Sequence, residues 1–303
     1  MHIDQDLLLQ FESQLDPVHP QQSAIYAKVL GYGEISSIFQ IGQNDGTAFK
    51  RLPIFDDHAA ASAYLNNYNE YCALLKQAGI ALPEDKGTIV EAAGHPVALY
   101  IAQRLLPAQS FTHKLIHTLS YKEIKNILER IILEIKKIWR FNAEQAPAFE
   151  LSIDGQLSNW ALLDGTLLYI DTGTPMFRKE GKEQLDPEPL LKSAPGFLRW
   201  ILRLFFLDDV MNRYYDERLV YIDLAANLYK EQRPDLIPLT IEIINQHLSE
   251  ALLSVTKDEV DKYYKEDKMI WTLFLSFRRI DRWICTQLLR RRYEFILPGK
   301  IKR

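Results

Sequence analysis

The sequence predicts an α+β fold, with a β-rich first lobe that contains one helix and a mainly helical second lobe. In the first hundred residues, short apolar runs are separated by glycine, which is typical of strands. From about Pro187 onward, apolar residues recur at helical spacing nearly to the end. The character changes after Pro107, so we expect a junction near 102–107 and two lobes, 1–102 and 103–303.

The elements of the first lobe follow from runs and turn residues. Five apolar runs predict strands, at 24–32, 36–42, 46–53, 87–93 and 95–103. Between the second and third runs, "QNDG" favours a tight hairpin turn. The segment 56–79 has apolar positions at helical spacing and ends at Gly79, as expected for a helix closed by glycine.

In the second lobe, a long amphipathic helix is predicted over 120–142. After it, "SIDGQLSNWALLDGTLLYIDTG" (152–173) reads as a hairpin of two apolar strings framed by polar residues. The most apolar stretch, 196–210, is interrupted by Arg199 and Arg203 and is shorter than the ~20 residues of a membrane span. We therefore expect a buried or amphipathic helix there.

Composition narrows the class of protein. Of the 303 residues, 47% are hydrophobic and 25% charged, which is the globular average. A net charge of −4 gives no general reason to expect a nucleic-acid or membrane partner. The two cysteines, Cys72 and Cys285, are far apart and imply neither a disulfide framework nor a zinc site. With no signal-peptide pattern at the start, we expect a cytoplasmic protein, and the oligomeric state stays open.

Several residues of the first lobe suit phosphate binding. Gly31 and Gly33 lie at a turn between strands, where glycine lets backbone amides approach phosphates. Lys50, on the following strand, is a cation within reach of such a group, and Glu70 in the next helix could hold Lys50 by an ion pair. The alternatives are an ordinary glycine hairpin and two solvated charges.

The hairpin segment supplies the matching polar groups. Asp154, Asn159 and Asp171 stand in the order of a phosphoryl-transfer centre. A carboxylate can orient or deprotonate an attacking hydroxyl, while an amide oxygen and a second carboxylate are ligands that Mg²⁺ selects. The separation between the two aspartates fits a hairpin whose ends return to one point. The alternative is an Asx-turn with an unremarkable loop aspartate.

This order of glycine loop, strand lysine, helix glutamate, D-x-x-x-x-N and D-x-G resembles the protein kinase-like superfamily. The motif sequences are closer to those of its aminoglycoside phosphotransferase and choline kinase branch. That branch has the motif H-G-D-x-x-x-x-N followed by I-D, where this chain has "SIDGQLSN" and "YIDTG". The similarity covers about 25–175, and it implies a bilobal protein kinase-like fold.

The resemblance also implies ATP and Mg²⁺ as cofactors and a role for each residue. Lys50 would contact the α- and β-phosphates, with Glu70 as its anchor. Asp154 would be the catalytic base, and Asn159 and Asp171 would hold Mg²⁺. In addition, the segment 100–106 would be the hinge, whose backbone receives adenine near Gln103 to Leu105.

Three departures from the family pattern keep other functions open. Ser152 stands in place of the family histidine, Ser36 in place of the third glycine, and Thr172 in place of an aromatic residue. A pseudokinase, meaning a nucleotide-binding scaffold without turnover, is therefore the alternative to an active phosphotransferase. A protein kinase is a third reading, but "SAPG" lacks the glutamate of A-P-E, which favours a small-molecule acceptor.

Two charged regions remain. Asp208, Asp209 and Asp216 occur among tyrosines and suit a cationic or hydroxylated substrate, and the alternative is a solvated helix face. The stretch 278–303 has nine basic residues against two acidic ones. It suits an acidic partner or a phosphate-rich surface, and the alternative is again a solvated helix.

Overall fold

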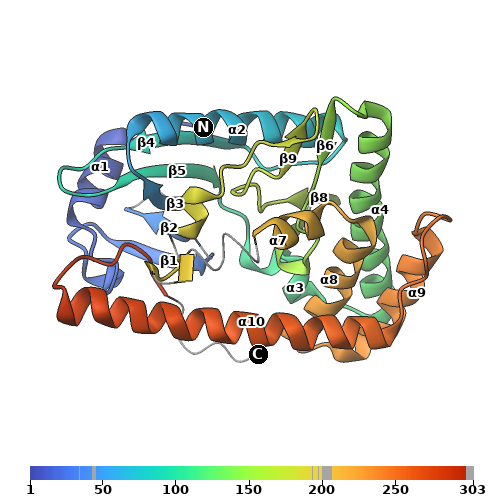
Figure 1. Cartoon of the computed structure of the whole chain (residues 1–303). Helices are drawn as coiled ribbons and strands as arrows, with labels where there is room; N and C mark the ends of the chain where they lie inside the picture. Colours follow the sequence, from blue (N-terminus) through green and yellow to red (C-terminus); the bar gives the residue numbers. More distant parts are fainter. Residues whose placement is uncertain (34, 43–45, 193, 197, 200–206, 298–303) are drawn as a thin grey trace.

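Five antiparallel strands in the order β1-β2-β3-β5-β4 form the main sheet of the protein. The structure is a computed structural model that describes residues 1–33, 35–42, 46–192, 194–196, 198–199 and 207–297. In Figure 1 this sheet, with helices α1 and α2, lies beside a group of helices formed by the later part of the chain. The predicted α+β class is confirmed.

The strands of the main sheet are β1 (Ala27–Tyr32), β2 (Ser37–Ile41), β3 (Thr47–Phe55), β4 (Asp85–Val90) and β5 (Val97–Arg104). Two smaller antiparallel sheets follow. They are made of β7 (Trp160–Leu163) with β8 (Thr166–Tyr169), and of β6 (Phe149–Leu151), β9 (Phe177–Lys179) and β10 (Lys182–Glu183). All five runs predicted as strands in the first lobe are confirmed, while the turn residues 43–45 lie outside the described residues.

The helices are α1 (Gln5–Gln14), α2 (His58–Gln77), α3 (Thr112–Leu115), α4 (Tyr121–Gln145), α5 (Glu188–Leu191), α7 (Leu207–Tyr214), α8 (Glu217–Lys230), α9 (Ile237–His247) and α10 (Lys257–Trp283). Gly79 follows α2 with φ +83°, in the left-handed conformation that glycine adopts without strain, as predicted. Of the predicted 196–210 helix, residues 197 and 200–206 lie outside the described residues. No helix within the described ranges is long and apolar enough to cross a bilayer.

The two faces of the main sheet pack against different helices. Phe49 and Tyr100 lie in a core cluster with Phe11 of α1, whereas Leu52 and Leu99 lie in a cluster with α2. Since side chains alternate along a strand, Lys50 shares the α2 side of β3 with Leu52. Its neighbour on β3 therefore points the opposite way.

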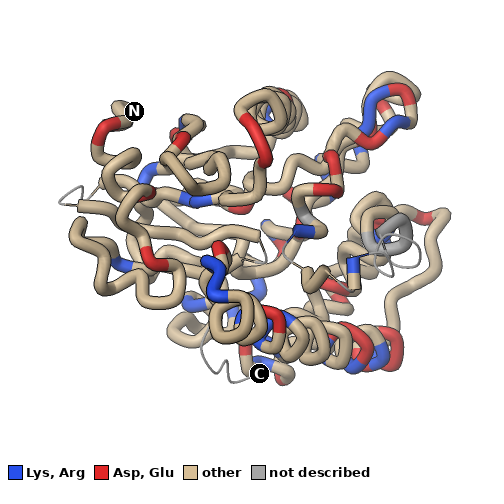
Figure 2. Tube along the Cα trace, turned by 60° about the vertical axis from the view of Figure 1, so that its left-hand side comes forward, with Lys and Arg blue, Asp and Glu red and all other residues tan. Residues whose placement is uncertain are grey.

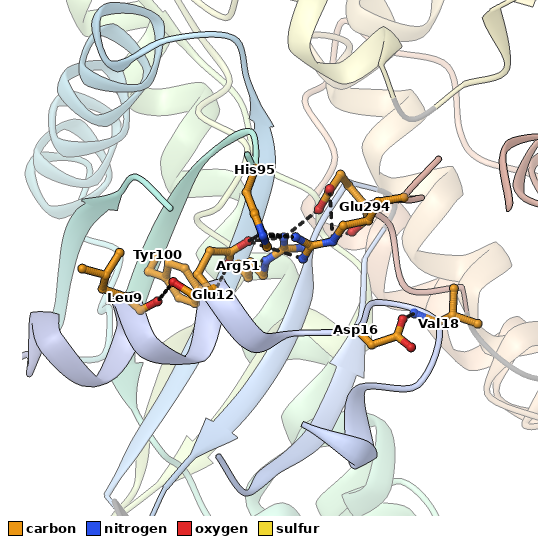
Figure 3. Close-up of polar contacts among 10 residues, drawn as sticks. Leu9, Glu12, Asp16, Val18, Arg51, His95, Tyr100 and Glu294 are labelled. Atoms are coloured by element: carbon orange, nitrogen blue, oxygen red, sulfur yellow. Dashed lines mark hydrogen bonds and ion pairs between the residues drawn. The ribbon is translucent and has the colours of Figure 1, made fainter. Parts of the chain in front are cut away.

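That neighbour, Arg51, is buried in a polar cluster on the α1 side of the sheet (Figure 3). Its guanidinium donates to Glu12 of α1 at 2.7 and 2.5 Å and to the backbone carbonyl of Glu294 at 3.0 Å. Tyr100 donates its hydroxyl to the same Glu12 carboxylate at 2.5 Å. Because Glu294 lies beyond α10, this cluster ties the tail of the chain to the sheet.

The largest core cluster lies under the later helices. The predicted amphipathic helix is confirmed as α4, which begins at a capping box formed by Ser120 and Glu123 and buries a row of isoleucines. That row packs with α8 and α9 and with the β7–β8 hairpin, whose Trp160 is fully buried. Helix α10 then crosses the molecule beneath both the helical group and the main sheet (Figure 1).

Candidate functional site

Lys50 of β3 and Asp171, just after β8, form an ion pair with 2.6 Å between Nζ and Oδ1. The lysine side chain is 13% exposed and the aspartate 37%, so the pair sits at the edge of the interior. Gly173 lies against the lysine, because an added Cβ there would be 2.7 Å from both Cδ and Nζ of Lys50. Two residues that the sequence places 121 positions apart are thus in contact, and the D-x-G glycine makes room for them.

The β7–β8 hairpin brings the metal-binding candidates to the same place. Trp160 pairs with Tyr169, and the N–H of Ile170 donates to the carbonyl of Asn159 at 2.9 Å. The hairpin closes through Asp164 and Gly165, both with positive φ, a turn that matches the strand twist. Asn159 and Asp171 therefore lie at the two adjoining ends of the hairpin.

The loop that carries Asp154 is held by its own polar atoms. The Asp154 carboxylate accepts the N–H of Gln156 at 3.1 Å, which is the Asx-turn that the sequence left open. The amide of Asn159 donates to the Asp154 carbonyl at 3.2 Å. Gly155 packs on α4, since a Cβ there would lie 2.7 Å from the Cδ1 atom of Ile135. The hydrogen bond of the asparagine and the close packing at the glycine thus both support the loop conformation.

Helix α8 supports this loop through two residues that the sequence analysis missed. Asn227 accepts the N–H of Leu157 at 3.0 Å, and Asp223 accepts the side-chain amide of Gln156 at 2.9 Å. Both are buried in a helix that otherwise buries apolar residues. The sequence signal for them is a pair of polar residues four apart on a helix face that is otherwise apolar and buried.

Several carboxyl groups at the site repel one another. Burial raises the pKa of Asp154 well above its ordinary value, and the negative charges of Asp223 and Asp171 raise it further. Burial likewise raises the pKa of Asp223. An excess of carboxylates with few neighbouring cations is the electrostatic setting that a bound cation relieves.

Ser152 occupies a filled position rather than an open one. It is fully buried, and its hydroxyl donates to the backbone carbonyl of Tyr214. Its own carbonyl accepts the hydroxyl of Tyr71 at 2.8 Å, and its N–H donates to the Met176 carbonyl at 3.0 Å. The ring of Tyr71 also stacks on Phe177, with 6.4 Å between centroids. Neighbouring groups therefore buttress the loop at the position where the kinase-like pattern has histidine.

A face of three tyrosines on α2 points at the site. Tyr64 donates to the Gly173 carbonyl at 2.9 Å, and the Thr172 hydroxyl lies 3.4 Å from that of Tyr68. Tyr71 completes the face through its bond to Ser152. These contacts hold the segments on both sides of the Lys50–Asp171 pair.

The prediction that Glu70 anchors Lys50 is wrong for this structure. Glu70 pairs with Lys179 of β9 at 2.5 Å, while Lys50 pairs directly with Asp171. The physical reason is helical phase. At about 100° per residue, Glu70 faces away from the side that Tyr64, Tyr68 and Tyr71 present.

Part of the predicted adenine-binding segment already makes hydrogen bonds within the protein. The side chain of Gln103 donates to the Ile170 carbonyl at 3.3 Å and to the Thr172 hydroxyl at 3.1 Å, so it braces the Asp171 segment. The N–H of Leu105 already donates to the Gly46 carbonyl at 2.9 Å, which corrects the expectation that it receives adenine. Within the described residues, the N–H of the next residue, Leu106, makes no hydrogen bond.

The two loop glycines lie where the sequence placed them. Gly31 is in β1 opposite Ile38, beside an irregularity in strand register. The N–H of Gly33 donates to the Ser36 carbonyl at 2.9 Å, and a Cβ on Gly33 would lie 2.5 Å from the Ser36 hydroxyl. A side chain at position 33 would therefore displace the Ser36 hydroxyl.

The three aspartates proposed for substrate binding are not brought together as a described cluster. Asp208 and Asp209 lie in α7, and their side chains are outside the described part of the structure. Asp216 is the N-cap of α8, where its carboxylate accepts the N–H of Leu219 at 2.9 Å. This gives Asp216 a structural role at a helix terminus.

Fold and site together define an α+β protein with a lysine–carboxylate centre at the end of a β-hairpin, facing one side of the main sheet. The chain belongs to a family of unknown function (DUF6206), which matches residues 19–282. Comparison with curated proteins gives no match.

Proposed function

We propose that the protein is an ATP- and Mg²⁺-dependent phosphotransferase with a bilobal protein kinase-like fold. It would phosphorylate a hydroxyl, or a guanidine or amine nitrogen, of a small molecule. The observation that carries the proposal is the contact between Lys50 and Asp171, 2.6 Å apart, beside the hairpin end that holds Asn159. A phosphate-binding cation and a metal-binding carboxylate are needed at one point in phosphoryl transfer.

The donor set fits Mg²⁺. Asn159 and Asp171 would hold the ion through an amide oxygen and a carboxylate, the hard oxygen ligands that it selects. In the described ranges, no group of three or more His, Cys, Asp or Glu residues is placed to hold a metal, which agrees with an ion that completes its shell with phosphate and water. When bound, Mg²⁺ neutralises negative charge on the phosphates.

Asp154 would act as the base. Its carboxylate would receive the acceptor's proton as the acceptor oxygen forms a bond to the γ-phosphorus and ADP leaves. A raised pKa suits this role, because a base is most effective when its pKa is near the working pH. Lys50 would hold the phosphates, and the free N–H of Leu106 is the backbone donor that we assign to adenine.

The test separates binding from chemistry with two variants. Asp171→Asn should weaken Mg²⁺-ATP binding, because it removes a charged metal ligand. Asp154→Asn should leave binding nearly intact and lower turnover. Thermal shift measures binding, since a ligand at ~100 times its Kd adds about 2.7 kcal/mol to the free energy of unfolding. Release of ADP measures turnover.

Asp164→Asn is the matched control, because Asp164 is exposed at the tip of the same hairpin and asparagine tolerates its positive φ. This control should change neither readout. No thermal shift with millimolar Mg²⁺-ATP, or identical behaviour of the Asp154 and Asp171 variants, contradicts the proposal.

A second function, nucleotide binding without transfer, is favoured by one observation. Lys50 lacks the glutamate partner that the resemblance implies, because Glu70 is engaged by Lys179. In that case Mg²⁺-ATP would still raise the melting temperature, but ADP release by wild type would equal that of Asp154→Asn. The same two measurements therefore decide between the two functions.

A further inference from the structure

The outer face of α10 carries a cluster of large apolar side chains that contact solvent. Seven of the sixteen large apolar residues exposed in the described structure gather on this helix and the turn after it. They are Met269, Ile270, Leu273, Ile280, Trp283, Leu288 and Leu289, each 46–64% exposed. We call these seven residues the α10 stripe. From the first residue to Trp283 it is about 20 Å long, at 1.5 Å per residue.

Helical spacing places the core of the stripe on one side of α10. Met269, Leu273 and Ile280 follow one another at four and seven residues, so they share a face. The opposite side is anchored to the protein, because Arg278 is buried and its guanidinium lies 5.2 Å from the ring centre of Phe295. Toward its N-terminal end, α10 packs on α8, where the rings of Tyr264 and Tyr229 stack. The helix is therefore held in place while the stripe points outward.

Positive charge accompanies the stripe. Between residues 268 and 292 the chain has seven Lys and Arg residues and a single acidic residue, Asp281, although the whole chain carries −4. Within the described ranges no ion pair engages Arg279, Arg290 and Arg291, three exposed arginines that lie beside the stripe or follow it directly. The charges along α10 can be followed in Figure 2.

We propose that the α10 stripe docks on an anionic membrane surface, with the helix lying in the plane of the interface. An apolar face that includes tryptophan, flanked by arginines, is the composition of helices that rest at the boundary between headgroups and acyl chains. Charge complementarity selects this occupant. A second copy of the chain would bring two arginine-rich surfaces together, which costs free energy, whereas anionic lipid attracts them. The proposal requires no catalytic activity.

The experiment uses the full chain and flotation with lipid vesicles. One set is made of phosphatidylcholine alone, and the other contains phosphatidylglycerol as well. We expect binding to the anionic set only, weakening as salt is added. Ile280→Ser with Trp283→Ser should lower the partition coefficient about tenfold or more. Arg279→Gln with Arg291→Gln should lower it about fivefold for each arginine.

Matched controls lie outside α10. Leu253→Ser removes an apolar side chain that is 81% exposed, and Arg140→Gln removes a cation that is 73% exposed. Neither should change partitioning. All variants should keep the wild-type melting temperature, and Met269→Ser with Leu273→Ser serves as a second apolar pair if the first does not fold.

Three results overturn the proposal. The first is that the chain does not float with anionic vesicles. The second is that it floats and the stripe variants float equally well. The third is that sedimentation shows a dimer which the Ile280→Ser and Trp283→Ser pair dissociates, because the stripe would then be covered by a second copy.

Discussion

A methyl group added at Gly173 tests the centre with a small change. Gly173→Ala would place a Cβ 2.7 Å from Cδ and Nζ of Lys50, whereas such atoms pack at about 3.5–4.0 Å. The end of the lysine must therefore retreat by about 1 Å. Its 2.6 Å contact with Asp171 then lengthens beyond the ~3.2 Å of a hydrogen bond. A misplacement of about 1 Å can lower a catalysed rate a hundredfold, so we expect a turnover loss of that order.

Stability should change much less than turnover. The pair joins two side chains that are partly in contact with water, so its loss costs only about 0.5–1 kcal/mol. Replacement of glycine by alanine at an unstrained φ adds about 0.4–1 kcal/mol by restricting the unfolded chain. These contributions nearly cancel. Chemical unfolding should therefore give a free energy of unfolding within about 1 kcal/mol of wild type.

The assay is ADP release from Mg²⁺-ATP, which needs no identified acceptor because water can take the phosphate. Gly196→Ala is the matched control, since an added Cβ there meets no atom of the described residues within 4 Å. The reasoning is refuted if Gly173→Ala retains wild-type turnover while Lys50→Met loses it. It is also refuted if the alanine variant unfolds, because the methyl group would then have displaced backbone rather than the end of one side chain.

Three further predictions concern the surroundings of the site. Ser152→Ala should lower the free energy of unfolding by about 1 kcal/mol and lower turnover several-fold, while Mg²⁺-ATP still binds. Ser152→His should not fold stably, because this position is filled. If Ser152→Ala lost activity as completely as Asp154→Asn, the positioning role of the serine would be contradicted. A folded-state pKa of Asp154 above the unfolded value stabilises the protein at low pH and loses that contribution as the pH rises through the raised pKa. The melting temperature of Asp154→Asn relative to wild type should therefore increase from acidic to alkaline pH, and a constant difference would show that the carboxyl group is not perturbed. Arg51→Met leaves the Glu12 carboxylate buried without its partner and should cost about 3–5 kcal/mol in urea unfolding, whereas Arg51→Met with Glu12→Gln should cost clearly less than the two single changes added together.

Local patterns in the sequence predicted what is local in the structure. The glycine punctuation of the first hundred residues gave the strands of the main sheet, and apolar spacing gave α2 and α4. The hairpin that brings Asn159 beside Asp171 could also be predicted, since a short hairpin returns to its starting point whatever surrounds it. Periodicity and turn chemistry are sufficient for such elements.

Contacts between distant elements could not be predicted in the same way. Asp223 and Asn227 support the Asp154 loop from some seventy residues away, and no short-range pattern links them to it. The expected ion pair of Glu70 with Lys50 rested on the order of the strand and the helix along the chain, without regard to helical phase. Reading the buried face of α2 from Tyr64, Tyr68 and Tyr71 would have shown that Glu70 lies on another side.

The alternation of side chains along β3 explains why two adjacent basic residues make different contacts. Lys50 points to Asp171, while Arg51 is enclosed by Glu12 and Glu294 on the opposite face. A one-residue slip of the strand would exchange them, leaving a buried lysine in a site shaped for a planar guanidinium and an arginine above Gly173. Such a slip would separate the buried carboxylate from the partner that satisfies it, which is costly. The Arg51 cluster, which includes the tail that follows α10, therefore fixes the strand register that presents Lys50 to the site.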